Sequence, residues 1–176
     1  MVGQTSFQPT AADFVTASRA NFLRQLRSRR FVVRLMAASG IAWLLMTALM
    51  LFLGEELGDA LVGGLYSSLM ALAGILLFLG VTLLLIPRRV ARLFRQSKAQ
   101  QVEMTVQWSD DACFWQSSNG QQRHEWSSYH RWSVSPKCYC LYLNEKLYQF
   151  VPRRALTANQ DQDLYDTLNR SDLTVW

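Results

Sequence analysis

The chain has 176 residues, half of them hydrophobic, and a formal net charge of +5 at pH 7. Its charges are segregated: residues 1–34 hold six arginines and one acid, residues 54–59 three acids, residues 87–98 five bases, and residues 99–176 seven bases and nine acids. The basic excess therefore lies beside two uncharged segments. This excludes a nucleic-acid-binding protein, in which the excess would lie on the folded domain.

Residues 1–30 are predicted to form a cytoplasmic segment with one short strand, Thr5–Gln8, and a basic amphipathic helix. Thr10 to Asp13 resembles a capping box. The apolar residues that follow share one helical face, with Arg24 and Arg27 opposite. Two alternatives remain open: the helix lies on an anionic membrane surface, or its apolar face docks on the C-terminal domain.

Two membrane-spanning helices are predicted, at 31–53 and 61–86. The stretches 35–53 and 60–86 contain no Asp, Glu, Lys or Arg. A bilayer core about 30 Å thick needs about 20 apolar helical residues. Buried helices of a soluble protein would show a polar stripe, and neither stretch has one. The connector 54–60 is then a short extracytoplasmic loop.

The orientation follows from the basic residues beside the two helices. Bases precede the first helix and follow the second, whereas the connector has none. Because cytoplasmic flanks carry the excess of Arg and Lys, both termini are predicted to be cytoplasmic. The segment 87–100 is a basic juxtamembrane linker. The predicted juxtamembrane bases are Arg29, Arg30, Arg34, Arg88, Arg89 and Arg92.

Small residues recur every four positions on the second helix, at Gly63, Ser67 and Ala71, with Gly64 and Ser68 one step round. Such spacing lets helices approach closely. We favour packing against the first helix of the same chain over homodimerisation. Neither helix has an ionisable residue inside it, which counts against a transporter or pump. A pore made by oligomerisation stays open.

Residues 101–176 are predicted to form a small antiparallel β domain. Apolar and polar residues alternate from Val102 to Trp108, which is typical of a half-buried strand. Asn119-Gly120 predicts a hairpin with a type I′ turn, in which both residues have positive φ. A second hairpin spans 138–151, and Thr157 with Gln160 caps a C-terminal helix. The predicted fold is a membrane α-helical hairpin plus a PH-like barrel or sandwich with a C-terminal helix.

The chain resembles the YcxB-like family of small bacterial membrane proteins. The resemblance rests on Phe7–Phe14 and on the set Trp126, Tyr129, Trp132, 141–143 and 150–156. It implies a cytoplasmic domain of the bacterial PH-like type, with two transmembrane helices inserted between its first elements and its main sheet. It also implies a location in the bacterial inner membrane. The family has no established general activity.

The residues offer little for catalysis or metal binding. Cys138 and Cys140 share one strand face, but structural zinc sites use pairs such as C-x₂-C, so we predict no metal site. The adjacent residues His124 and Glu125 point to opposite faces of a strand, which argues against a catalytic dyad. No nucleophile-elbow, Walker or zincin motif occurs. We therefore predict no cofactor and no enzymatic activity.

Arg153-Arg154, which follow Pro152, are the most notable charged pair. A guanidinium matches phosphate with two hydrogen bonds, so these residues, with Tyr142 from the domain's many aromatic residues, are the predicted contacts for a partner or a headgroup. The alternative, a solvated turn with a purely electrostatic role, is favoured by the weak contribution of exposed charges.

The sequence thus favours a membrane-anchored binding or regulatory protein that engages a protein partner or lipid headgroups at the inner leaflet. An immunity-type protein that neutralises a membrane-acting toxin is one concrete version. The predicted partners are membrane lipids and a protein partner or a second copy of the chain, with no nucleic acid. The alternative is an oligomeric channel or transport accessory subunit gated by the cytoplasmic domain.

Overall fold

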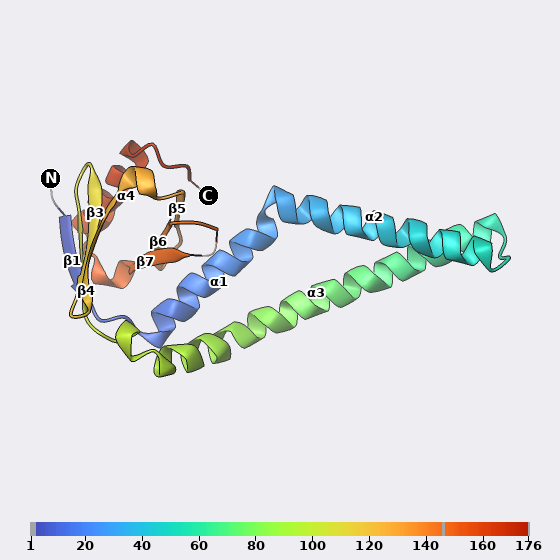
Figure 1. Cartoon of the computed structure of the whole chain (residues 1–176), viewed down its shortest axis with the longest axis horizontal. Coiled ribbons are helices and arrows are strands. Elements are labelled where there is room, and N and C mark those ends of the chain that lie inside the picture. Colours follow the sequence, from blue (N-terminus) through green and yellow to red (C-terminus); the bar gives the residue numbers. More distant parts are fainter. Residues whose placement is uncertain (1–2, 146, 176) are drawn as a thin grey trace. The chain divides into compact units, whose positions relative to one another are not determined.

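The computed structural model describes residues 3–145 and 147–175. The chain divides into two compact units, each described here by itself. One unit joins the N-terminal segment up to Ala20 with the segment from Pro87 onward, and the other consists of Asn21–Ile86. The two segments of the first unit are blue and green to red in Figure 1, so the whole second unit separates them in sequence.

Two long apolar helices make up most of the second unit. α2 covers Arg29–Phe52 and α3 covers Leu57–Gln96, and both are long and apolar enough to cross a membrane. Little of them is packed inside protein: 6% of the most apolar stretch of α2 is buried, and none of that of α3. Exposing so much apolar surface to water would be unfavourable. The two helices therefore indicate a membrane protein, as the sequence predicts.

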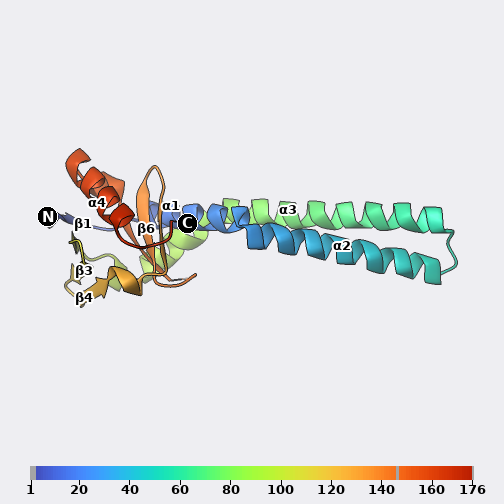
Figure 2. The same ribbon diagram turned by 90° about the horizontal axis from the view of Figure 1, so that it is seen from above.

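The hairpin of the second unit closes in a short turn after Leu53, where Gly54 has a φ of 92°. This left-handed conformation suits glycine because it has no Cβ. In Figure 1 the two helices converge towards this turn, and in Figure 2 the turn is seen to connect their ends.

A separate helix, α1, covers Ala11–Arg27 and ends just before α2. Ser28 separates the two, and its hydroxyl oxygen accepts a hydrogen bond from the Phe31 N–H at 3.2 Å and caps α2. The strand expected in residues 1–30 is present as β1, Gly3–Phe7, and the amphipathic helix as α1.

α3 continues past Pro87 to Gln96, into the segment 87–100 that the sequence assigns to a linker. Proline lacks an N–H and removes one helical hydrogen bond, but membrane helices tolerate this loss. The extension makes an apolar contact that the sequence does not reveal. The Phe94 ring lies 5.2 Å from the Phe14 ring, centroid to centroid.

Two antiparallel sheets form the β domain of the first unit, with the orders β1-β2-β3-β4 and β5-β6-β7. The further strands are β2 Met104–Trp108, β3 Ala112–Ser117, β4 Gly120–Glu125, β5 Arg131–Val134, β6 Cys138–Tyr142 and β7 Tyr148–Pro152. β1 pairs with β2 from Gly3 opposite Trp108 to Phe7 opposite Met104. A strand that precedes the apolar helices is thus an edge strand of a sheet whose other strands follow them.

The β3–β4 hairpin forms where the sequence predicts it, but its turn differs. Ser117 pairs with Gly120, so Ser118 and Asn119 are the loop residues. Gly120 has a φ of 142°, whereas no non-glycine residue in the described part of the chain has a positive φ. The predicted type I′ turn is therefore wrong. The Asn119 side chain instead donates to the Ala99 carbonyl at 3.2 Å.

α4, Ala158–Arg170, is the C-terminal helix, and it lies beside β1 (Figure 2). The predicted capping box is confirmed, because the Thr157 hydroxyl accepts from the Gln160 N–H and the Gln160 side chain accepts from the Thr157 N–H. Leu164 and Leu168 carry its apolar face into the core, with 1% and 0% exposure. Gln160 also donates to the Gln4 carbonyl of β1 at 2.7 Å.

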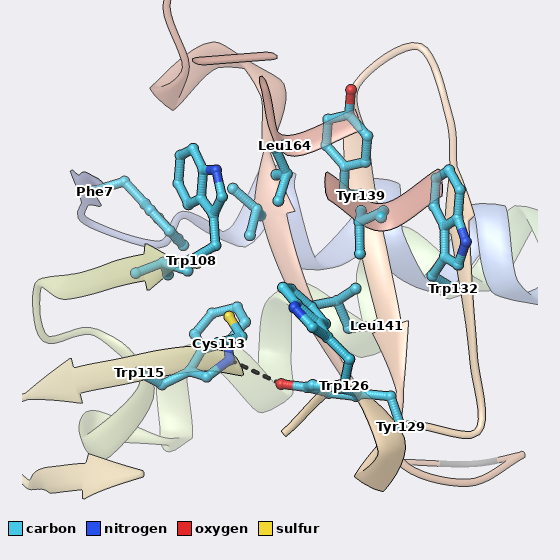
Figure 3. Packing of buried hydrophobic residues seen from close by; sticks show 13 residues of the cluster. Phe7, Trp108, Cys113, Trp115, Trp126, Tyr129, Trp132, Tyr139, Leu141 and Leu164 are labelled. Atoms are coloured by element: carbon cyan, nitrogen blue, oxygen red, sulfur yellow. Dashed lines mark hydrogen bonds between the residues drawn. The ribbon is translucent and has the colours of Figure 1, made fainter. Parts of the chain in front are cut away.

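The core of this unit is mostly aromatic (Figure 3). Trp115 of β3 donates its indole N–H to the Tyr129 hydroxyl at 3.0 Å, and Tyr129 donates to Gln149 of β7 at 2.6 Å. Trp108 is fully buried and donates to Asp163 of α4 at 2.8 Å. The Trp108 and Trp115 indoles and the Tyr129 hydroxyl thus have polar partners that join the two sheets and the helix, whereas the buried Trp132 indole nitrogen has none in the described part of the chain.

β6 is buried on both faces. Tyr139 and Leu141 belong to the main core, and the alternate residues Cys138, Cys140 and Tyr142 belong to a second cluster with Ala17 of α1. Ala17 is fully buried, and the rings of Phe14 and Phe150 meet edge to face at 4.8 Å. Between the two alternatives for the amphipathic helix, the first turns of α1 therefore dock on the β domain.

Candidate functional site

Arg153 and Arg154 follow directly after β7, in one 3-10 turn that covers Arg153–Ala155. Pro152 ends the strand in an extended conformation, and the Leu156 N–H closes the turn on the Arg153 carbonyl at 3.1 Å. The structure directs the two neighbouring guanidinium groups to different carboxylates, one on α4 and one on α1.

The Arg153 guanidinium binds Asp161 in the first turn of α4. Its Nε donates to Asp161 Oδ1 at 2.7 Å, and its Nη2 donates to Oδ2. The hydrogen bond from Arg153 holds the pKa of the Asp161 carboxyl below its usual value, against the opposing effect of partial burial. The same guanidinium lies over the Tyr139 ring, 5.7 Å from its centroid.

The Arg154 guanidinium binds Asp13 in the first turn of α1. Its Nε donates to Asp13 Oδ1 at 3.0 Å and its Nη2 to Oδ2 at 2.5 Å, while Nη2 also donates to the Gln8 carbonyl at 2.9 Å. The Thr10 N–H and hydroxyl donate to the same Asp13 carboxylate at 2.8 and 2.7 Å. Burial raises the pKa of Asp13, but the hydrogen bonds from Arg154 and Thr10 outweigh it and leave the pKa below its usual value.

A pocket of about 480 Å³ opens beside these two ion pairs. Three segments line it: the start of α1, the turn between β5 and β6, and the end of β7. The lining residues are Thr10, Ala12, Asp13, Thr16, Pro136, Lys137, Cys138, Pro152, Arg153 and Arg154. The Arg153 N–H donates to the Lys137 carbonyl at 2.9 Å, which fixes the lysine's backbone next to the arginine turn.

The lining carries three cations against one carboxylate, so the pocket has a positive balance. Lys137 is exposed and forms no ion pair with a residue that the structure describes. Arg153 and Arg154 are 37% and 50% exposed in their side chains. A guanidinium has five N–H donors, and the carboxylates use only some of them. The arrangement suits a group with several anionic oxygen acceptors.

The predicted contact residue Tyr142 is not in this pocket. It is 1% exposed, on the face of β6 covered by α1, with its ring 5.6 Å from Tyr148 and its hydroxyl 3.5 Å from the Ser133 hydroxyl. The structure thus brings Arg153 and Arg154 to one pocket and places Tyr142 in the packing beneath α1.

The predicted helix-packing residues lie on the helix face next to the one with which α3 contacts α2. The buried residues of α3 are Ala60, Gly64 and Ser68. Gly64 faces Thr47 and Trp43 of α2. Of the predicted set, Gly63 faces the Met50 side chain, Ser67 is half-buried and donates to the Gly63 carbonyl at 2.9 Å, and Ala71 is exposed.

The predicted juxtamembrane bases are all exposed, on two helices. Arg29 and Arg30 begin α2, and Arg34 follows one turn later. Arg88, Arg89 and Arg92 lie on the part of α3 beyond Pro87.

Sequence reasoning missed Asp13, Asp161 and Lys137 as members of the site. A signal existed for Asp13, because the Thr10–Asp13 capping box places a carboxylate at a helix start. No local signal indicates that this carboxylate meets Arg154, since the two stand 141 positions apart.

A larger hollow of about 690 Å³ lies between the end of α4 and the β4–β5 connection. Its acids are Asp110, Asp111, Glu125 and Asp172, and Arg170 pairs with Asp110 at 3.2 Å. Both of these partners are 64% exposed, so solvent screens the pair. This hollow lacks the converging, partly buried groups of the arginine pocket.

In a comparison with protein-family models, residues 108–168 match the family of YcxB-like proteins. The matched region runs from the end of β2 into α4 and includes Lys137, Arg153 and Arg154. Comparisons with the curated proteins and with the solved structures give no match.

Proposed function

The chain carries a YcxB-like domain in residues 108–168, and from this premise we propose that it is a non-enzymatic, membrane-anchored binding protein whose basic pocket holds the phosphate of an anionic lipid headgroup. The pocket lined by Lys137, Arg153 and Arg154 carries the proposal.

The proposed architecture of the binding domain is PH-like. It is supported by the order of the elements: a sheet of four antiparallel strands, a sheet of three, and then a C-terminal helix. In this architecture α1, α2 and α3 occupy the connection between the first two strands. The membrane anchor is thus an insertion within the binding domain.

The proposed orientation places both termini and the β domain on the cytoplasmic side of the bacterial inner membrane. The exposed arginines before α2 and at the end of α3 support it, together with the three acids and no bases of 54–59. The inner leaflet is rich in anionic lipids, and each base near it contributes about 1 kcal/mol of attraction. The membrane that anchors the domain would then also supply its lipid ligand.

The chemistry of the pocket supports a phosphate ligand. Guanidinium groups bind phosphate with two parallel hydrogen bonds, and a lysine adds a point charge. Asp161 and Asp13 hold the two guanidinium groups in fixed positions, so binding does not have to order them. The carboxylates also neutralise part of the positive charge, and Lys137 supplies the uncompensated cation.

Titration with a soluble headgroup fragment tests the chemistry. The full chain in an uncharged detergent is titrated with glycerol 3-phosphate, and binding is followed by thermophoresis. Lys137→Gln removes one exposed charge without breaking either ion pair, and about 1 kcal/mol predicts about fivefold weaker binding. The matched control is Lys98→Gln, since Lys98 is also exposed but does not line the pocket. Equal affinities for both variants would overturn the assignment.

Photo-crosslinking tests the source of the phosphate. A photo-reactive amino acid replaces residue 137 or, as the control, residue 98, and the chain is irradiated in native membranes. The proposal predicts adducts of anionic phospholipid at position 137 that glycerol 3-phosphate suppresses. A specific protein adduct without lipid would replace the headgroup by a protein partner, and so would contradict the proposal.

A further inference from the structure

β4, Gly120–Glu125, is an edge strand of the four-stranded sheet. In the order β1-β2-β3-β4 it pairs with β3, and Figure 2 shows it on the far side of β3 from β1. The opposite edge, β1, is in contact with α4, whose Gln160 donates to the Gln4 carbonyl. Every residue of β4 is exposed except His124, which is half-buried. β4 therefore offers an open edge for pairing with a further strand.

The register with β3 decides which backbone groups of β4 face this open edge. The Trp126 N–H donates to the Asp111 carbonyl at 3.2 Å, one position beyond the paired residues of the two strands. Hydrogen-bonded and non-hydrogen-bonded pairs alternate along an antiparallel ladder. Arg123 and Glu125 therefore turn their N–H and C=O groups away from β3. The Glu125 carbonyl accepts from the Ser128 hydroxyl at 2.6 Å, and a carbonyl has a second lone pair for another donor.

Two opposite charges mark the same edge. Arg123 and Glu125 are exposed and, because they are two residues apart on a strand, they share one face of the sheet. The Arg123 guanidinium lies over the Phe114 ring, 5.5 Å from its centroid, which holds it on that face. Neither charge forms an ion pair with a residue that the structure describes. A complementary strand would present a carboxylate opposite Arg123 and a cation opposite Glu125.

We propose that β4 pairs with β4 of a second copy of the chain, antiparallel and about a two-fold axis at His124. Arg123 of each copy then lies opposite Glu125 of the other, so one symmetric contact forms two ion pairs. The same residues exchange backbone hydrogen bonds through their outward groups. An axis at Arg123 or at Glu125 would set like charges opposite each other, and an axis at Gln122 would set both charges opposite uncharged residues.

The proposed contact is small and relies on the membrane anchor. Edge pairing of six residues buries far less surface than the roughly 1,600 Å² of a standard interface. Two chains anchored in one membrane meet at a high effective concentration, which offsets this weakness. None of the β4 residues lines the arginine pocket, so the pairing does not depend on headgroup binding.

Disulfide trapping in native membranes tests the register. Across the proposed axis the two residues at position 124 form a non-hydrogen-bonded pair with Cα atoms about 4.5 Å apart, within reach of a disulfide. The two residues at position 122 are then about 14 Å apart, beyond that reach. On oxidation His124→Cys should give a disulfide-linked dimer, whereas Gln122→Cys and the natural sequence, whose cysteines are buried, should not. No dimer from His124→Cys, or an equal yield from Gln122→Cys, would overturn the proposal.

Charge reversal tests the ion pairs. In the His124→Cys chain, Arg123→Glu or Glu125→Arg alone sets like charges opposite each other and should slow dimer trapping about tenfold. Both reversals in one chain should restore the rate, and the two singly reversed chains should form a mixed dimer when coexpressed. Because both rescues require folded chains, they exclude misfolding as the cause of the loss.

Two results of this series would reject the proposal. Equal trapping rates in the single and double reversals would show that Arg123 and Glu125 do not meet across the contact. A disulfide from position 124 to a different protein, in place of the dimer, would assign the open edge to another partner.

Discussion

Asp13 and Arg154 stand 141 positions apart, yet their side chains form a two-point ion pair. Asp13 precedes both apolar helices and Arg154 follows them, so the pair joins the two halves of a domain that the hairpin interrupts. β1 makes the same connection through its pairing with β2. The β domain is complete only when the segment before the hairpin has joined the segment after it.

We expect Asp13→Asn to destabilise the first unit. The change weakens two charge-assisted hydrogen bonds from Arg154 and two from Thr10, and Asp13 is only 9% exposed. Hydrogen bonds to charged groups contribute about 1.5–3 kcal/mol each when buried, but Arg154 is half exposed, so we expect a total near 1–3 kcal/mol. Thermal unfolding in detergent measures the effect. Asp172→Asn, at an exposed carboxylate outside this network, is the control and should have almost no effect.

Stability should fall in acid because of the same carboxylates. Asp13 and Asp161 have pKa values below their ordinary 3.8, owing to hydrogen bonds from Arg154 and Thr10 at the first and Arg153 at the second. A lowered folded-state pKa stabilises the protein fully above the unfolded value and is lost as the pH falls through the folded value. The unfolding temperature should therefore be steady above about pH 5 and drop below about pH 4. In Asp13→Asn this drop should be smaller; an equal drop would show that other groups cause it.

Much of the fold follows from local patterns in the sequence. The two uncharged apolar stretches specify α2 and α3, and alternation of apolar and polar residues specifies β2. The Thr157–Gln160 capping box marks the start of α4. Each of these signals lies within a few residues of the element it specifies, so no distant contact is needed to recognise it.

The candidate site is harder to predict because distant contacts build it. Arg153-Arg154 stand out as a charged pair, but their acidic partners come from the starts of two different helices. The continuation of α3 beyond Pro87 brings Phe94 against Phe14, and the two are 80 positions apart in sequence. The burial of Tyr142 cannot be predicted from its own segment, because α1, which covers this face of β6, is distant in sequence.

The contact between α2 and α3 should tolerate a methyl group at Gly74, less at Gly63, and least at Gly64. A Cβ at Gly64 would collide with Thr47 and crowd the Trp43 backbone, whereas at Gly63 it meets the flexible end of Met50 and at Gly74 nothing within 4 Å. Overpacking costs about 1–3 kcal/mol, so Gly64→Ala should lower hairpin stability by about that amount. Unfolding in increasing SDS measures the series. A larger effect at Gly63 than at Gly64 would favour the face predicted from the sequence.

The Tyr129 hydroxyl is a buried polar link between the two sheets, and Tyr129→Phe should remove it. The residue is 3% exposed, accepts from the Trp115 indole at 3.0 Å and donates to Gln149 at 2.6 Å. Removing the hydroxyl leaves the buried Trp115 N–H without this acceptor, at a cost of about 1–3 kcal/mol.

Tyr165→Phe is the matched control. Its ring packs on Trp132, but its hydroxyl has no hydrogen-bond partner in the described part of the chain, and the residue is 39% exposed. Chemical unfolding followed by tryptophan fluorescence compares the two variants. Equal stabilities would mean that the hydrogen bonds of the Tyr129 hydroxyl add nothing to the stability of the domain, whereas a loss confined to Tyr129→Phe assigns part of that stability to them.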